Sequence, residues 1–207
     1  MDIRNYNSKE VIVFRKTTEA FGGLSNMASG YALYVNEVII PSSEHLYQAM
    51  RYPTNPEIQF EIISQDNAMK AKMISNKYKA AYSRPDWEKN QIKIMRWVLE
   101  LKLAQNWDKF STILQETQNK SIVEYATDNK IWGAKPSNNN ELVGVNALGR
   151  LLMELREKYI FNQDKRLYCV NPPNVPALLL YNQYVDVVCD DKIIDFHNED
   201  LLEESYI

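Results

Sequence analysis

A carboxylate stands near the start of a predicted helix, directly after a glycine-rich loop and a short hairpin, in the stretch AFGGLSNMASGYALYVNEVIIPSSEHLYQAMR at 20–51. Helical periodicity places Glu44, Gln48 and Arg51 in one polar stripe, with apolar residues on the opposite face. Such a stripe is usually a solvated surface, but FGGLSNM has more glycine and fewer charges than an ordinary surface turn. We therefore predict that this stretch forms the floor of an active site, with Glu44 placed to do chemistry on the ligand.

The loop before this helix supplies small polar groups. Gly23 permits backbone conformations closed to other residues, and Ser25 and Asn26 follow as compact donors and acceptors. A serine at 42–43 is predicted to cap the helix, whose free N–H groups favour anions. Arg15 ends the apolar run VIVF before the loop and could face a phosphate, although a surface arginine is the more ordinary interpretation. The combination predicts a phosphorylated or nucleotide-like ligand.

The rest of the chain supplies a mainly helical scaffold. Apolar spacing predicts helices at 44–51, 57–64, 67–74 and 83–117, the last as the central scaffold, and a final helix capped by Asn146. Short strands are predicted at 11–14 and 121–126 and a hairpin at 31–40. Three tryptophans spaced by ten residues, at 87, 97 and 107, are more typical of a core stripe than of a base-stacking ladder.

Composition favours one domain plus an appendage. The chain has 207 residues, 45% of them hydrophobic, and a net charge of −3. Ten lysines or arginines and five acids lie in 64–109, whereas 186–207 holds one lysine and eight acids. A basic middle could meet a phosphate backbone while the acidic end masks it in the total. After Phe161 the sequence becomes proline-rich and then β-type, so hairpins are expected there.

Cysteine and terminal patterns bear on compartment and cofactors. Cys169 and Cys189 have neither CxxC spacing nor a histidine cluster beside them, so the sequence predicts no metal site, and it indicates no cofactor. MDIRNYNSKE lacks the apolar core of a signal peptide, and no apolar run approaches a membrane span. We expect a cytoplasmic protein without membrane contacts and with both thiols reduced.

Four separated segments resemble the NADAR domain family: FGGLSNM, IIPSSEHLYQAMR, IWGA and GVNALGRLLMELRE. The resemblance runs from about Val11 to Tyr159. It implies an α+β, predominantly α-helical domain over 1–160, with a small β-hairpin or sheet near the site. A β-rich C-terminal extension over 161–207, proline-rich and then β-type with an acidic end, follows outside the resemblance.

The resemblance implies an N-glycosidase. Some family members cleave phosphoribosyl-amine intermediates of riboflavin synthesis, and others remove ADP-ribose from guanine in DNA. The segments FRKTTEAFGGLSNMA, SRPDWEKNQIKIMRWVLELKLAQN and LGRLLMELRE are most similar to the second group. That group implies ADP-ribosylated guanine, in single-stranded DNA, as substrate. It also implies a DNA ADP-ribosyltransferase toxin as cognate partner, with an antitoxin or phage-defence role.

The family chemistry assigns roles to individual residues. Glu44 would shift protons at the sugar, and a lysine on the next short helix would form a Schiff base, which corresponds best to Lys72, with Lys70 as the alternative. The family's Trp-Gly pair corresponds to Trp132 and Gly133. Where the family pattern has an aspartate three residues before that tryptophan, this chain departs. It has Asn129, with Asp128 one position earlier, so either could act.

The predicted site therefore divides into two sets. The catalytic set is Glu44, Lys72 and Asp128, and the ligand-contacting set is Arg15, Gly23, Ser25, Asn26, Gln48, Asn129, Trp132 and Gly133. Two other classes of function remain open. A binding module would recognise ADP-ribose without turnover, and an interaction protein would sequester a toxin through its C-terminal extension.

Overall fold

The computed structural model describes residues 2–128, 131–137, 140–162 and 166–190. The α-helices in these ranges are α1 (Ser43–Ala49), α2 (Pro56–Ile63), α3 (Ala68–Tyr82), α4 (Trp87–Gln105), α5 (Trp107–Glu116) and α6 (Ala147–Arg156). A 3-10 turn lies at Gly22–Leu24, and α6 continues into a π-helical turn at Glu157–Phe161. Across the described residues, no helix combines the length and apolar character that crossing a membrane requires.

Short strands surround these helices. β1 (Arg4–Asn7), β7 (Glu141–Gly144) and β6 (Lys135–Pro136) form an antiparallel sheet in that order. β2 (Ile12–Phe14) pairs in parallel with β5 (Ile122–Glu124), and β3 (Leu33–Val35) with β4 (Val38–Ile40) as a hairpin. Beyond residue 166, β8 (Cys169–Val170) pairs with β11 (Val188–Cys189) and β9 (Leu179–Leu180) with β10 (Gln183–Tyr184). The chain is thus α+β and mainly helical, as predicted.

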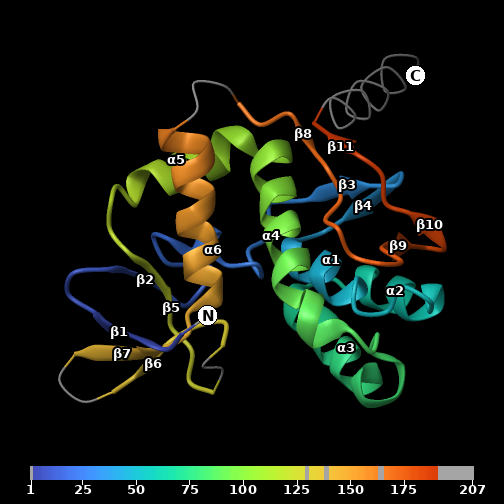
Figure 1. Cartoon of the computed structure of the whole chain (residues 1–207), viewed down its shortest axis with the longest axis horizontal. Coiled ribbons are helices and arrows are strands. Elements are labelled where there is room, and N and C mark those ends of the chain that lie inside the picture. The colour runs from blue at the N-terminus through green and yellow to red at the C-terminus, as the bar shows by residue number, and fades with distance from the viewer. Residues whose placement is uncertain (1, 129–130, 138–139, 163–165, 191–207) are drawn as a thin grey trace, which may run out of the picture.

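Helix α4 is the centre of the molecule. Its apolar residues face the core on nearly all sides, and Trp97 is 1% exposed. In Figure 1, α6 and the β2–β5 pair lie on one side of α4, and α1 to α3 with the β3–β4 hairpin lie on the other. A helix contacted on both sides has to be apolar around most of its circumference, which explains its long run of buried positions.

Two helix boundaries differ from the prediction. The run 83–117 divides at Asn106, whose backbone leaves helical geometry and whose Nδ2 donates to Ala32 O at 3.0 Å. Helix α3, predicted to end at Ile74, continues to Tyr82, because glycine and proline are absent from this segment until Pro85. The longer α3 places two more turns beside the cavity described below.

Local turn and cap chemistry explains several elements. Asn36 and Glu37 both have positive φ, 50° and 63°, which is the backbone that a two-residue hairpin turn requires. Asn67 caps α3 as predicted, accepting from Lys70 N at 3.0 Å. Asn146 begins α6 in a left-handed conformation and makes no side-chain cap hydrogen bond, so the predicted cap is wrong. Its amide is used elsewhere, on β5.

The C-terminal strands pack against the helical core. Gln59 Nε2 donates to Leu179 O at 2.8 Å, and Arg84 Nη2 donates to Pro176 O at 2.6 Å. Cys169 and Cys189 form a disulfide, which corrects our expectation of two reduced thiols. Pairing of β8 with β11 places the two cysteines opposite each other, with Cα atoms 4.0 Å apart. The acidic end at 191–207 lies outside the described residues.

Candidate active site

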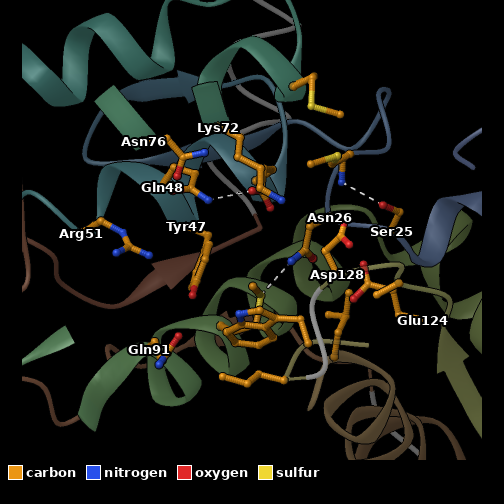
Figure 2. Close-up of a pocket in the computed structure, with 18 of the residues that line it drawn as sticks. Ser25, Asn26, Tyr47, Gln48, Arg51, Lys72, Asn76, Gln91, Glu124 and Asp128 are labelled. Carbon is orange, nitrogen blue, oxygen red and sulfur yellow. Dashed lines mark hydrogen bonds between the residues drawn. The ribbon is translucent and has the colours of Figure 1, made fainter. Parts of the chain in front are cut away.

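One cavity of about 570 Å³ opens between α1, α3, the start of α4 and the segment after β5 (Figure 2). It collects most of the residues predicted from the sequence. Those that line it are Glu44, Lys72, Asp128, Arg15, Ser25, Asn26, Gln48 and Trp132. Gly23 and Gly133 are not part of its lining, and Asn129 lies outside the described residues.

Glu44 lies in the first turn of α1, with its side chain buried against the cavity wall. Gln48, one turn later on the same helix face, donates from Nε2 to Glu44 Oε1 at 2.8 Å. Burial raises the pKa of Glu44, while the hydrogen bond from Gln48 and the nearby charges of Lys72 and Arg51 oppose that shift. Glu44 is thus an oriented carboxylate close to a lysine.

The glycine-rich loop, not a serine, caps α1. Asn26 O accepts from Glu44 N at 3.0 Å, so the loop and the helix join at the cavity. The predicted serine cap is wrong, because Ser42 Oγ bonds instead to His45 Nδ1 at 2.8 Å and Ser43 Oγ has no partner among the described residues. The Glu44 N–H is therefore already satisfied. One of the first-turn N–H groups on which the predicted anion site depends is therefore unavailable to a ligand.

A buried lysine holds the loop in place. Lys102 of α4 is 0% exposed, and its Nζ donates to Gly23 O at 2.5 Å and to Ser25 O at 3.0 Å. The ammonium also lies 4.3 Å from the ring centroids of Tyr31 and Phe110. Burial lowers the pKa of Lys102 to about 7. Gly23 thus has a packing role, since a Cβ there would lie 2.4 Å from the Tyr31 hydroxyl.

Glu124, a residue that the sequence analysis missed, is a second carboxylate in the cavity. It ends β5 and lines the cavity with its side chain only partly exposed. Asn146 fixes this strand end, accepting from Glu124 N at 3.1 Å and donating to Ile122 O at 2.8 Å. Burial and the charge of Glu44 raise the pKa of Glu124 to about 7, and Lys72 opposes the shift. The sequence signal that could have identified it was a charged residue, Glu124 itself, at the end of the mainly apolar run SIVE.

Asp128, the predicted second acid, also lines the cavity but is exposed. Its Oδ2 accepts from Thr127 Oγ1 at 3.1 Å. The structure thus places two carboxylates from this segment in the cavity, the partly buried Glu124 and the exposed Asp128. The catalytic role of Asp128 stays a prediction.

The two candidate lysines lie on different faces of helix α3. Lys72 lines the cavity together with Met69, Asn76 and Lys79, which recur at helical spacing on one face. Lys70 points away and pairs with Asp66 at 2.7 Å. Only Lys72 of this pair lines the cavity.

Aromatic rings form part of the cavity wall. Tyr47 packs against Trp87 and Trp132, with ring centroids 5.0 and 5.5 Å away. Gly133 does not face the ligand space but lets its segment approach β5, since a Cβ there would lie 2.5 Å from Glu124 O. Arg15 lies at the cavity with its guanidinium 4.8 Å from the Tyr125 ring centroid. Flat apolar walls beside two carboxylates suit a base or sugar ring.

Comparison with known families matches residues 13–159 to the NADAR domain. The chain belongs to the NADAR family. The protein named N-glycosidase YbiA from Shigella boydii serotype 4 is 31% identical over 157 residues, which are 75% of this chain and 92% of that protein. Riboflavin biosynthesis protein VVA0006 from Vibrio vulnificus is 28% identical over 157 residues but only 41% of its length is covered.

A solved structure has a similar fold. The NMR structure of Escherichia coli YbiA superimposes with a TM-score of 0.59 at 26% identity, covering 72% of this chain and 85% of that one. The NADAR match ends at residue 159, so the strands β8 to β11 lie beyond it. Every cavity residue named above lies within the NADAR match.

Proposed function

We propose that this protein is an N-glycosidase that removes ADP-ribose from guanine in DNA. The observation that carries the N-glycosidase chemistry is the meeting of Glu44, Glu124 and Lys72 in one cavity, where the charges of Glu44 and Lys72 act on the pKa of Glu124 and the charge of Lys72 acts on the pKa of Glu44. Cleaving a bond between ribose C1 and nitrogen requires proton transfer to and from the sugar and stabilisation of positive charge at C1. Two carboxylates with raised pKa values and a lysine supply these functions.

The reaction divides into three steps. The protonated Glu124 carboxyl gives a proton to the ribose ring oxygen, so that the ring opens and C1 forms an imine with the base nitrogen. Lys72 gives a proton to the Glu44 carboxylate, and its amine adds to C1. The base nitrogen takes one proton from the added lysine nitrogen and leaves as a free amine, so that a protonated Schiff base remains between Lys72 and the sugar. Water hydrolyses that imine, releasing the sugar and the protonated lysine, while Glu44 gives up its proton and Glu124 regains one from solvent.

The DNA substrate is supported by the charge of α3. This helix carries Lys70, Lys72, Lys77 and Lys79 and no acid, and it borders the cavity along its length. Exposed Met69 and Ile131 lie at the same cavity, where unstacked bases could rest. A basic helix beside the reacting groups suits a polynucleotide, whose phosphates would neutralise the exposed lysines. Reversal of a DNA modification is also the chemistry of an antitoxin against a DNA ADP-ribosyltransferase.

A second candidate is an N-glycosidase of phosphoribosylamino-pyrimidines in riboflavin synthesis. It is favoured by the similarity to proteins named for riboflavin biosynthesis in Vibrio vulnificus and in Zea mays, where 28% identity extends over 162 residues. The catalytic groups would be the same. The two candidates differ in what is attached to the ribose.

One experiment separates these candidates. The purified protein is incubated with a single-stranded oligonucleotide carrying ADP-ribosylated guanine and, separately, with the phosphoribosylamino-pyrimidine, and the released sugar is measured by mass spectrometry. We expect release from the oligonucleotide, lost in Glu44→Gln and retained in Lys70→Ala, whose lysine faces away. Release from the pyrimidine alone supports the second candidate. Tight binding of ADP-ribose without turnover of either substrate would refute the enzyme and leave a binding module.

A further inference from the structure

Two buried polar groups in the cavity lack partners and lie away from Glu124. Arg51 is 9% exposed and Tyr47 is 4% exposed. Neither Arg51 Nε nor the Tyr47 hydroxyl finds a hydrogen-bond partner among the described residues. Figure 2 places both toward one side of the cavity, with Glu124 on the other side. Buried donors without acceptors are uncommon, because desolvating them is expensive.

Arg51 has an anchored position but no anion. Its guanidinium lies 4.1 Å from the Trp87 ring centroid, which fixes the plane of the group. Within the part of the chain that is described, no carboxylate forms an ion pair with it. Glu88, which also lines the cavity, accepts instead from Gln91 Nε2 at 2.5 Å. A fixed, charged and unpaired guanidinium inside a cavity is a binding group for an oxyanion.

Glu44 and Arg51 lie at opposite ends of α1. Glu44 is in the first turn of this seven-residue helix, Arg51 follows its last residue in a turn, and both side chains line the cavity. The helix is about 10 Å long, so a ligand that reaches both groups is longer than a ribose ring alone and needs a substituent on C5. The sugar's C1 would then lie toward Glu44 and its phosphate toward Arg51.

We propose that Arg51 and Tyr47 form the subsite for a phosphate ester on C5 of the substrate's ribose. This subsite deepens the proposed function, on which it rests for the identity of the sugar. Tyr47 donates from its hydroxyl and Arg51 donates from its guanidinium to the phosphate oxygens. Two kinds of ligand carry such a phosphate on C5: one with a single phosphate, as in ribose 5-phosphate, and one with a diphosphate, as in ADP-ribose. Lys79, an exposed cation lining the same cavity, would reach only the more extended diphosphate.

The test measures binding of ribose, ribose 5-phosphate and ADP-ribose to the whole protein by calorimetry. Wild type is expected to bind at least one phosphorylated ligand about 10-fold to 100-fold more tightly than ribose, since hydrogen bonds to charged groups have that strength. Arg51→Met and Tyr47→Phe are expected to remove most of this preference. Arg96→Met, which removes an exposed arginine outside the cavity, is the matched control.

Thermal stability of the free protein distinguishes a ligand role from a structural one. Tyr47→Phe deletes only an unpartnered hydroxyl, so its melting temperature is expected to stay the same or rise.

Comparison of the two phosphorylated ligands identifies which one the subsite accepts. A preference for ADP-ribose that Lys79→Ala weakens identifies the diphosphate, whereas equal binding of ribose 5-phosphate and ADP-ribose identifies the single phosphate.

Two outcomes overturn the subsite. The first is a wild type that does not distinguish ribose from its phosphates, and the second is an unchanged preference in both Arg51→Met and Tyr47→Phe. None of these ligands carries the bond between ribose and guanine or pyrimidine nitrogen that the proposed reaction cleaves, so the result is independent of turnover. A protein that binds sugar phosphates through Arg51 but cleaves no N-glycoside keeps the subsite and loses the proposed function.

Discussion

Replacing Glu124 by glutamine separates its effect on stability from its effect on catalysis. The pKa of Glu124 is about 7 in the folded protein, against an ordinary 4.5. The unfolded chain therefore loses this proton first as pH rises, so folding stability falls between about pH 4.5 and 7 and the penalty is complete above pH 7. The difference of about 2.5 pKa units corresponds to about 3 kcal/mol, reduced to about 2 to 3 kcal/mol by screening at a partly exposed side chain.

Glu124→Gln keeps the shape of the side chain and cannot ionise. Urea unfolding at pH 4 should give it nearly the same stability as wild type, and at pH 8 it should be about 2 to 3 kcal/mol more stable. Turnover should fall by about 10²-fold to 10⁴-fold, and the loss of wild-type activity above pH 7 should disappear from the residual rate. Glu116→Gln, at an exposed position on α5, is the control for both measurements.

Two results would refute this account of Glu124. If Glu124→Gln were less stable than wild type at pH 8, the wild-type Glu124 carboxylate would stabilise the fold, whereas we expect its burial to destabilise the fold. If turnover stayed within a few-fold of wild type, Glu124 could not be the general acid, and the exposed Asp128 would be the next residue to replace.

Three further predictions use other parts of the site. Glu44→Gln should lower turnover by about 10²-fold to 10⁴-fold while circular dichroism stays that of the wild type, and a rate within a few-fold of wild type would exclude a role in proton transfer. Borohydride added during turnover should fix the sugar to Lys72, as mapped by mass spectrometry. The adduct should persist in Lys70→Ala and vanish in Lys72→Ala; a persistent adduct in Lys72→Ala would place the Schiff base elsewhere. A chain ending at Asp190 loses six acids and one lysine, so it should bind unmodified DNA more tightly than the full-length protein at low salt. The two affinities should become equal at high salt, because salt screens the charges. Equal affinity at every salt concentration would refute this electrostatic effect.

Local sequence signals predicted the elements around the site well. The Asn36-Glu37 turn, the Asn67 cap and the polar stripe of α1 depend on neighbours in sequence, so propensity and periodicity were sufficient. The structure also places Glu44 and Lys72 in one cavity, where the family resemblance had put them together. Their chemical roles remain predictions.

The features missed by the sequence analysis depend on partners distant in sequence. Asn146 had the right type and position for a helix cap, yet its amide bonds to β5, 22 and 24 residues earlier in the chain. In the sequence, Glu124 is only a single glutamate within a predicted strand. Its raised pKa arises from burial and from the charge of Glu44, which lies on another element. Pairing of Cys169 with Cys189 likewise depends on the register of two short strands, which the sequence does not fix locally.

The buried Lys102 has a consequence for transferring this site to other proteins. Its two hydrogen bonds reach Gly23 O and Ser25 O, 79 and 77 residues away in the chain. A neutral amine still carries two N–H groups, so both carbonyls keep a donor whether or not the lysine is protonated near its pKa of about 7. Grafting the glycine-rich loop onto another scaffold would therefore also require a helix whose lysine donates to the two loop carbonyls. The loop sequence alone would not reproduce the site.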